Sequence, residues 1–154
     1  MTATSCHLRG GENGFCTQDG GYLIGHTCTS SDNSVGYLIF GGIMELLNCS
    51  SEGDDVGCVV EGGHLAATNV AVTNSDKDGF YLMAGKAELT RCSAKCCHGD
   101  GMLFEDTEAR VQDCTVDTNS YAGFAAMGTA SVAVRGVEAE RTVIWGSMWG
   151  ATRR

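Results

Sequence analysis

Short runs of alternating apolar residues recur along the chain, and each begins directly after a glycine. In the run that starts at Gly79, Phe80 and Leu82 would face one side of an extended strand. Tyr81 and Met83 would face the other side. Six glycines open these runs at intervals of 22, 21, 22, 22 and 22 residues: Gly14, Gly36, Gly57, Gly79, Gly101 and Gly123. A fixed interval of this length predicts a solenoid in which each repeat forms one rung.

Each repeat contains two further segments with the pattern of a strand. The second begins about eight residues after the glycine and supplies apolar pairs at alternate positions: Tyr22 and Ile24, Met44 and Leu46, Leu65 and Ala67, Ala87 and Leu89, Ala109 and Val111. The third is marked by a column of cysteines, with Ala71 in the one missing place: Cys6, Cys28, Cys49, Cys92 and Cys114. Three short strands per repeat predict an all-β, three-sheeted parallel β-helix of about six rungs.

We expect residues 1–136 to form this solenoid as one domain. Residues 137–154 lack the rung pattern and contain both tryptophans of the chain, Trp145 and Trp149. We expect this segment to leave the solenoid path as a C-terminal tail that packs on the solenoid or on a partner.

The repeat resembles the right-handed parallel β-helix superfamily, which includes pectin-lyase-like proteins and the carbohydrate-binding and sugar-hydrolase repeats. The resemblance covers residues 4–136 and rests on Asp78-Gly79-Phe80-Tyr81-Leu82, Asp100-Gly101-Met102-Leu103-Phe104 and the segment from Ala87 to Cys92. It implies the right-handed fold. Because such rungs occur in lyases, hydrolases, epimerases and non-catalytic adaptors alike, it does not imply one activity. No catalytic residue of the family carries over to a position in this sequence.

The cysteine column predicts a ladder of buried, reduced thiols. Stacked residues on neighbouring rungs lie about 4.8 Å apart, and their parallel Cα–Cβ bonds do not suit a disulfide. The chain has nine cysteines, an odd count, and its opening residues lack a basic and then apolar signal segment. These features predict an intracellular, cytoplasmic protein, although a processed secreted domain also fits. No apolar run approaches the length of a membrane span, so we expect no membrane partner.

The net charge of −9 argues against a nucleic-acid partner, which would need a basic surface. Acidic residues gather in the turns before the glycines and would stack into an acidic ridge: Glu52, Asp54, Asp55, Asp76, Asp78 and Asp100. Five of them, Asp54, Asp55, Asp76, Asp78 and Asp100, are the catalytic candidates if the protein cleaves sugars with a carboxylate pair. Asp76, Asp78 and Asp100 are candidate Ca²⁺ ligands. The alternative is that these residues only favour the turns, with no metal or cofactor bound.

The outward positions of the first strand are largely apolar. They supply a candidate binding surface: Leu38, Phe40, Val59, Tyr81, Met83 and Leu103. An apolar stripe of this extent is typical of an interaction surface, unless a segment such as the tail covers it. Because the stripe is mostly aliphatic, we rank protein contact above carbohydrate. The periodic column already begins at Cys6, so we also expect another copy or a further domain to cover the first rung.

The sequence therefore predicts a non-catalytic module that binds a protein or a carbohydrate, or associates with itself. The alternative hypothesis is a small polysaccharide lyase, epimerase or glycoside hydrolase that uses the acidic ridge. A carboxylate pair in an open groove would favour the enzyme, whereas an exposed apolar sheet would favour the module.

Overall fold

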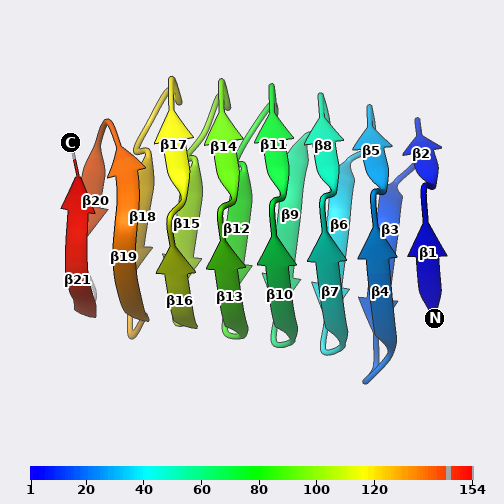
Figure 1. Cartoon of the computed structure of the whole chain (residues 1–154), viewed down its shortest axis with the longest axis horizontal. Coiled ribbons are helices and arrows are strands. Elements are labelled where there is room, and N and C mark those ends of the chain that lie inside the picture. The colour runs from blue at the N-terminus through cyan, green and yellow to red at the C-terminus, as the bar shows by residue number, and fades with distance from the viewer. Residues whose placement is uncertain (145–146, 154) are drawn as a thin grey trace.

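The computed structural model describes residues 1–144 and 147–153, with side chains described up to residue 141. The chain winds as a parallel β-solenoid whose strands stack along the long axis, with the termini at opposite ends (Figure 1). Sheet 1 consists of seven parallel strands, one from each turn: β3 (Asn13–Gln18), β6 (Val35–Phe40), β9 (Val56–Glu61), β12 (Phe80–Met83), β15 (Met102–Glu105), β18 (Phe124–Met127) and β20 (Thr142–Ile144).

Two further ladders complete each turn. Sheet 2 contains β1 (Thr2–Thr4), β4 (Tyr22–His26), β7 (Ile43–Leu47), β10 (His64–Thr68), β13 (Lys86–Thr90), β16 (Glu108–Gln112), β19 (Ser131–Ala139) and β21 (Ser147–Arg153). Sheet 3 contains β2 (His7–Arg9), β5 (Thr29–Ser31), β8 (Ser50–Glu52), β11 (Ala71–Thr73), β14 (Ser93–Lys95) and β17 (Thr115–Asp117). The long strand β19 pairs with both β16 and β17, so sheets 2 and 3 are joined at this end. The predicted three-sheeted parallel β-helix is confirmed.

We count rungs from the sheet-1 strand that opens each one, so rung 1 is β3–β5 and rung 6 is β18–β19. The six periodic glycines lie where the chain enters sheet 1, and close approach between rungs explains the first five of them. A Cβ added at Gly79 would lie 2.5 Å from the carbonyl oxygen of Gly101 and 2.7 Å from Cβ of Ala94. Gly36 and Gly57 have the same relation to the carbonyl of the next glycine in the column. Only glycine lets successive rungs approach at this corner.

The inside of the solenoid is a continuous apolar core. In sheet 1 the residues after the glycines stack along the axis, and the rings of Phe15 and Tyr37 lie 5.2 Å apart in parallel planes. Phe80 and Leu82 are buried while Tyr81 and Met83 are partly exposed, as the alternation predicts. The hydroxyl of Tyr37 donates to a backbone carbonyl, that of Cys28 or Ser50, each 3.0 Å away, so its buried polar group is satisfied.

The predicted register of the second strand is wrong in rung 1. Leu23 and Gly25, not Tyr22 and Ile24, are the buried residues that pair with the inward positions of β7. The reason is one extra residue at the corner between sheets 1 and 2, where rung 1 has three residues between its strands and rung 2 has two. A shift of one residue moves every side chain to the opposite face. Tyr22 is consequently 45% exposed.

The third ladder also needs one correction. Val70, rather than Ala71, fills the missing place in the cysteine column, because Ala71 pairs with Ser50 and Ser93, the residues that follow cysteines. Val70 is buried and Ala71 is partly exposed. The interval from this column to the next periodic glycine is eight residues from Cys49 to Gly57 but nine from Val70 to Gly79, so the corner before sheet 1 gains one residue from rung 4 onward.

The predicted path of the C-terminal segment is corrected as well. The backbone does not leave the solenoid after residue 136, because β20 pairs in parallel with β18 and β21 pairs in parallel with β19. These strands extend sheets 1 and 2 by a further turn. Trp145 lies outside the described residues and the side chain of Trp149 is not described, so their expected packing on the apolar stripe stays a prediction.

Each corner of the solenoid holds a column of residues in the left-handed backbone region. Gly41, Gly62 and Gly128 occupy one such column, but its rung 4 member is Ala84, with φ of 51°. A residue with a Cβ is strained in this region, and Ala84 is exposed, so its methyl group contributes little packing.

We therefore expect Ala84→Gly to raise the free energy of unfolding by about 0.5–1 kcal/mol, measured by urea denaturation. Ala133→Gly is the matched control, because Ala133 is also exposed but lies within strand β19. It should lower the stability by about 0.5–1 kcal/mol, since glycine weakens a strand interior. Equal changes in the two variants would contradict this explanation of the corner.

The thiol ladder is confirmed except at its first position. Four of its members are buried: Cys28, Cys49, Cys92 and Cys114. Cys6 is exposed because only one turn packs against it. All nine cysteines are free, and burial raises the pKa of Cys49, Cys58 and Cys97.

Thiol labelling of the native protein should therefore modify only the three exposed cysteines, Cys6, Cys16 and Cys96, with the other six protected until unfolding. Burial raises the pKa of Cys16, so we expect it to react more slowly than an unperturbed exposed thiol. Mass spectrometry of intact and then unfolded protein measures both stages. Rapid modification of Cys49 or Cys58 in the native state would contradict the burial of the ladder.

Candidate interaction surface

The outward column of sheet 1 lies as the sequence predicts. Cys16, Leu38, Val59, Tyr81 and Leu103 are adjacent along the ladder, in register. Leu38, Val59, Tyr81 and Leu103 are all partly exposed, and Met83 lies beside Glu61 and Glu105 in the next column. The hydroxyl of Tyr81 donates to Glu105 at 2.9 Å, and burial together with this hydrogen bond raises the pKa of Tyr81 to about 12. This face is therefore less uniformly apolar than the sequence suggested.

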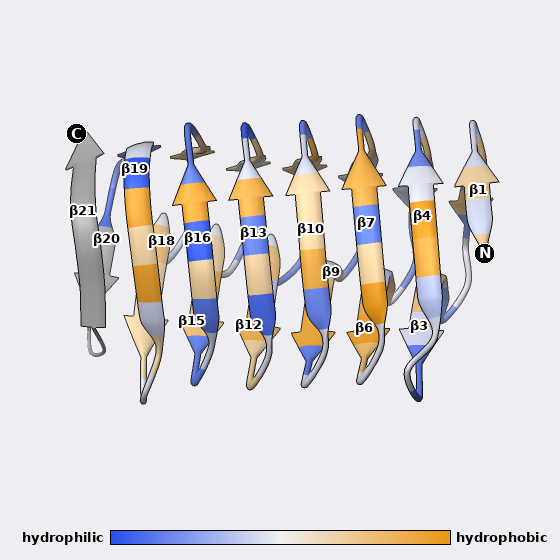
Figure 2. Ribbon diagram, turned by 60° about the horizontal axis from the view of Figure 1, so that its bottom comes forward, coloured by the Kyte–Doolittle hydropathy of each residue, from blue (hydrophilic) through white to orange (hydrophobic). Residues whose placement is uncertain are grey.

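A more exposed apolar surface lies at the corner between sheets 1 and 2 in rungs 1 and 2. Phe40 ends β6, Ile43 begins β7 after two glycines, and Tyr22 of β4 pairs directly with Ile43. Phe40, Ile43 and Tyr22 are 53%, 42% and 45% exposed, and Leu47 at the other end of β7 is 37% exposed. We call these four residues the corner patch. Figure 2 shows hydrophobic colouring along much of β4, β6 and β7, interrupted on β7 by one hydrophilic band.

A hollow of about 310 Å³ adjoins the corner patch on the outer face of sheet 2. Ile24, His26 and Leu47 line it, and the small side chain of Ala66 leaves the space between larger neighbours. The hydroxyl of Tyr22 donates to Glu45 at 2.6 Å, which raises the pKa of Tyr22 and fixes its ring over the strand. The corner patch therefore borders a concave surface at Leu47.

Sequence reasoning missed three of the four residues of the corner patch. The alternation that buries Met44 and Leu46 already implies that Ile43 and Leu47 point outward. Tyr22 was missed because of the register shift in rung 1. Phe40 was predicted as part of the binding surface and is the most exposed of the four.

The acidic residues of the predicted ridge do not share one environment. Asp54 is fully buried and faces the interior, so it does not belong to an exposed ridge. Its carboxylate accepts hydrogen bonds from the backbone and side-chain amides of Asn33, at 2.8 and 3.0 Å, and from the hydroxyl of Ser51, at 2.6 Å. The sequence did not reveal this because residues at a corner do not alternate regularly between inside and outside.

Asp78 and Asp100 each hold the next rung in place. The carboxylate of Asp78 accepts the backbone N–H of Asp100 at 2.7 Å, and that of Asp100 accepts the N–H of Ala122 at 2.7 Å. Burial raises the pKa of Asp78. Asp55 is partly exposed, while Asp76 is exposed and lies 3.6 Å from the imidazole of His98.

Within the part of the chain that the structure describes, no three histidine, cysteine or acidic side chains lie close enough together to hold a metal ion. Asp78 and Asp100 each use one oxygen on a backbone amide, which leaves fewer oxygens for Ca²⁺. The Ca²⁺ site formed by Asp76, Asp78 and Asp100 stays a prediction.

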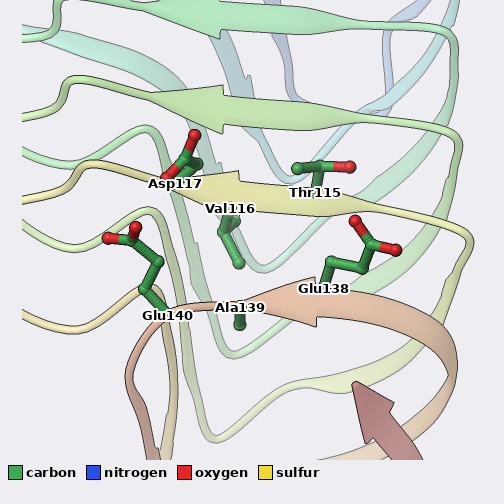
Figure 3. A pocket seen from close by; sticks show the side chains of 6 residues that line it. All are labelled: Thr115, Val116, Asp117, Glu138, Ala139 and Glu140. Carbon is green, nitrogen blue, oxygen red and sulfur yellow. The ribbon is translucent and has the colours of Figure 1, made fainter. Parts of the chain in front are cut away.

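A second hollow, of about 380 Å³, lies between β17 and the end of β19 (Figure 3). Asp117 and Glu140 lie together on one side of it and Glu138 lies beside Thr115 on the other, while Val116 and Ala139 point away from these side chains. Glu140 also accepts the backbone N–H of Thr118 at 3.2 Å. Among the side chains that the structure describes, none that lines this hollow is positively charged, as orienting an acidic sugar would require.

The fold defines the protein as a β-solenoid repeat module whose exposed apolar corner is its candidate site. A sequence model described as the right-handed beta helix region matches residues 1–139. The chain therefore belongs to the right-handed beta-helix family, and the predicted handedness is confirmed. No curated protein matches the sequence. In the described residues, no helix has the length and hydropathy that crossing a bilayer requires.

Proposed function

We propose that this solenoid is a non-catalytic interaction module that binds a protein through the corner patch. The observation that carries the proposal is that Tyr22, Phe40 and Ile43 gather around one corner, with Leu47 on the same outer face at the far end of β7, each more than a third exposed. Contiguous exposed apolar surface favours an interaction site, because leaving it in water is unfavourable. Aliphatic residues make up half of the patch, which supports a protein partner above a carbohydrate.

The alternative of a small carbohydrate-active enzyme has less support. Among its candidate carboxylates, Asp54 is buried in the solenoid, and Asp78 and Asp100 are hydrogen-bonded to backbone amides. General acid–base chemistry on a polysaccharide needs carboxylates that can reach the glycosidic bond in an open groove. Asp55 and Asp76 remain accessible to solvent but lack such a groove among the described hollows.

The intracellular location is part of the same proposal. Free thiols at all nine cysteines, six of them buried, are consistent with a reducing compartment. The buried thiols serve as small apolar residues in the narrow interior.

Site-specific photo-cross-linking tests the interaction function. A photoreactive phenylalanine analogue at position 40 should give one discrete adduct in the source cells, and Ile43→Ser should abolish it. The same analogue at position 110, exposed on sheet 2 in rung 5 and three rungs from β7, should give no such adduct. The same adducts from both positions, or none from position 40, would contradict the proposal.

A further inference from the structure

The net charge of the protein is concentrated in the rungs that carry the corner patch. Between Arg9 and Lys77 the sequence contains no lysine or arginine but nine acidic residues: Glu12, Asp19, Asp32, Glu45, Glu52, Asp54, Asp55, Glu61 and Asp76. The remaining residues contain ten acids and ten basic residues, so they are neutral overall. The entire charge of −9 therefore lies in rungs 1–3 and the adjoining turns.

Carboxylates border the corner patch directly. Glu45 lies between Ile43 and Leu47 on the outer face of β7, and Glu61 pairs with Phe40 in the neighbouring rung. Asp19 lies at the corner one rung before Phe40, to whose carbonyl it donates its backbone N–H at 3.1 Å. Asp19 and Glu45 are exposed and Glu61 is partly exposed.

Cationic side chains close to these carboxylates are already engaged elsewhere. In sheet 2, Lys86 lies two strands from β7 and pairs with Glu108 at 3.0 Å. In sheet 3, Arg9 pairs with Asp32 at 2.6 Å. The N-terminal ammonium group donates to the carbonyl of Tyr22 at 2.7 Å and offsets one of these charges. Three carboxylates border the patch, so the potential around it is still negative and would attract a cation toward the apolar surface.

From this we infer that the corner patch binds a cationic amphipathic segment of a partner protein, in which apolar side chains alternate with lysine or arginine. The inference rests on the interaction function proposed above and names the chemistry of the partner. Apolar side chains would cover Tyr22, Phe40 and Ile43, while the cations would lie against Glu45, Glu61 and Asp19. Charge complementarity of this kind steers association and selects among partners.

Charge also argues against a second copy of the chain as the occupant. A symmetric dimer through the corner patch would bring Glu45 and Glu61 of one protomer against the same residues of the other. Like charges at an interface oppose association and suppress the wrong partner.

Binding of labelled model peptides, followed by fluorescence anisotropy, tests the inference on the full chain. The probes are short peptides of alternating leucine and lysine, leucine and glutamine, or leucine and glutamate. We expect the leucine–lysine peptide to bind about tenfold more tightly than the leucine–glutamine peptide at about 0.05 M salt, and this advantage to shrink at about 0.5 M. The leucine–glutamate peptide should bind most weakly.

Two sets of variants locate the binding. Ile43→Ser should abolish binding, and the double variant Glu45→Gln with Glu61→Gln should remove most of the preference for lysine. The amide oxygen introduced at position 45 can still accept the hydrogen bond from the hydroxyl of Tyr22, so the apolar patch keeps its shape. Tyr121→Ser and Glu138→Gln are controls at exposed residues far from the patch, and both should bind as the unaltered protein does. Circular dichroism of each variant confirms that the fold is retained.

The outcomes separate this inference from the interaction function. Equal affinity for the lysine and glutamine peptides, with loss in Ile43→Ser, would overturn the cationic partner but leave the interaction function standing. A concentration-dependent dimer in sedimentation that Ile43→Ser dissociates would show that a second copy is the occupant, which also overturns the inference. Glu138→Gln could also weaken binding as much as the double variant Glu45→Gln with Glu61→Gln does. That result would overturn the inference, because it would show nonspecific charge attraction.

Discussion

Gly79→Ala should lower the free energy of unfolding by at least about 3 kcal/mol, a large share of the 5–15 kcal/mol that is typical of a domain. The added Cβ would lie 2.5 Å from the carbonyl oxygen of Gly101, and 2.7 Å from Cβ of Ala94. The backbone cannot move away from it, because Gly79 and Phe80 donate their N–H groups to the next rung at 2.9 Å. Relief of the contact would therefore separate two rungs and weaken the ladder on both sides.

Gly11→Ala is the matched control for this substitution. Gly11 lies at a corner of the same solenoid, but a Cβ there would meet only ordinary contacts, at 3.5 Å from Asn33 and 3.7 Å from Asn13. Its stability in urea denaturation should stay within about 0.5 kcal/mol of the unaltered protein. If Gly79→Ala were equally mild, close approach between rungs would not explain the repeated glycines.

Asp54→Ala should lower the free energy of unfolding by about 3 kcal/mol, whereas Asp54→Asn should change it by less than about 1 kcal/mol. Alanine would leave the amides of Asn33 and the hydroxyl of Ser51 buried without their acceptor. Asparagine retains an acceptor oxygen for the backbone amide of Asn33, and its own amide can donate to Ser51. The previous rung has an asparagine, Asn33, at the equivalent position. Its side-chain amide donates to Ser30 at 2.8 Å and its oxygen accepts the backbone N–H of Gly11 at 2.8 Å.

Thermal and urea unfolding of both Asp54 variants measure this difference. The pair separates a structural role of Asp54 from a catalytic one, since asparagine preserves the hydrogen bonds but not the acid. Equal, large losses of stability in the two variants would mean that the negative charge itself is required in the interior.

The buried thiols also predict how stability depends on pH. An unfolded thiol has a pKa of about 8.5, whereas burial raises the pKa of Cys49, Cys58 and Cys97 in the folded protein. Above about pH 8.5 the unfolded chain therefore loses protons that the folded chain keeps, and the free energy of unfolding should fall as the pH rises. Cys58→Val removes one such group and should make the fall shallower. A stability that rises with pH over this range would contradict burial of the thiols.

The fold could be predicted from the sequence because its strongest constraints are periodic. At the corner before sheet 1, successive rungs approach so closely that a residue with a Cβ does not fit. Gly36, Gly57 and Gly79 therefore mark the period directly. Strand alternation then assigns inward and outward residues wherever the corner lengths are constant. In rung 2 this assignment places Met44 and Leu46 inside and Ile43 and Leu47 outside.

The candidate site was harder to predict because it depends on the corners, where the sequence has no fixed period. One extra residue between β3 and β4 turned Tyr22 outward, and an inward turn buried Asp54 among polar neighbours. The left-handed corner positions hold different residue types in different rungs, such as Asn69 and Arg91 in one column, so they mark no fixed period. The apolar stripe of sheet 1 was predicted correctly in position, but the exposure is greatest around the corner that it shares with sheet 2.

Amide hydrogen exchange with and without the leucine–lysine peptide tests the central claim most directly, since it reports binding residue by residue. The claim is that this solenoid binds a partner at the corner formed by β4, β6 and β7. It predicts slower exchange on binding for residues 22–24 and 40–47, with no change in β16 and β19. Protection that is absent from residues 40–47, or that is strongest along β16 and β19, would contradict the claim.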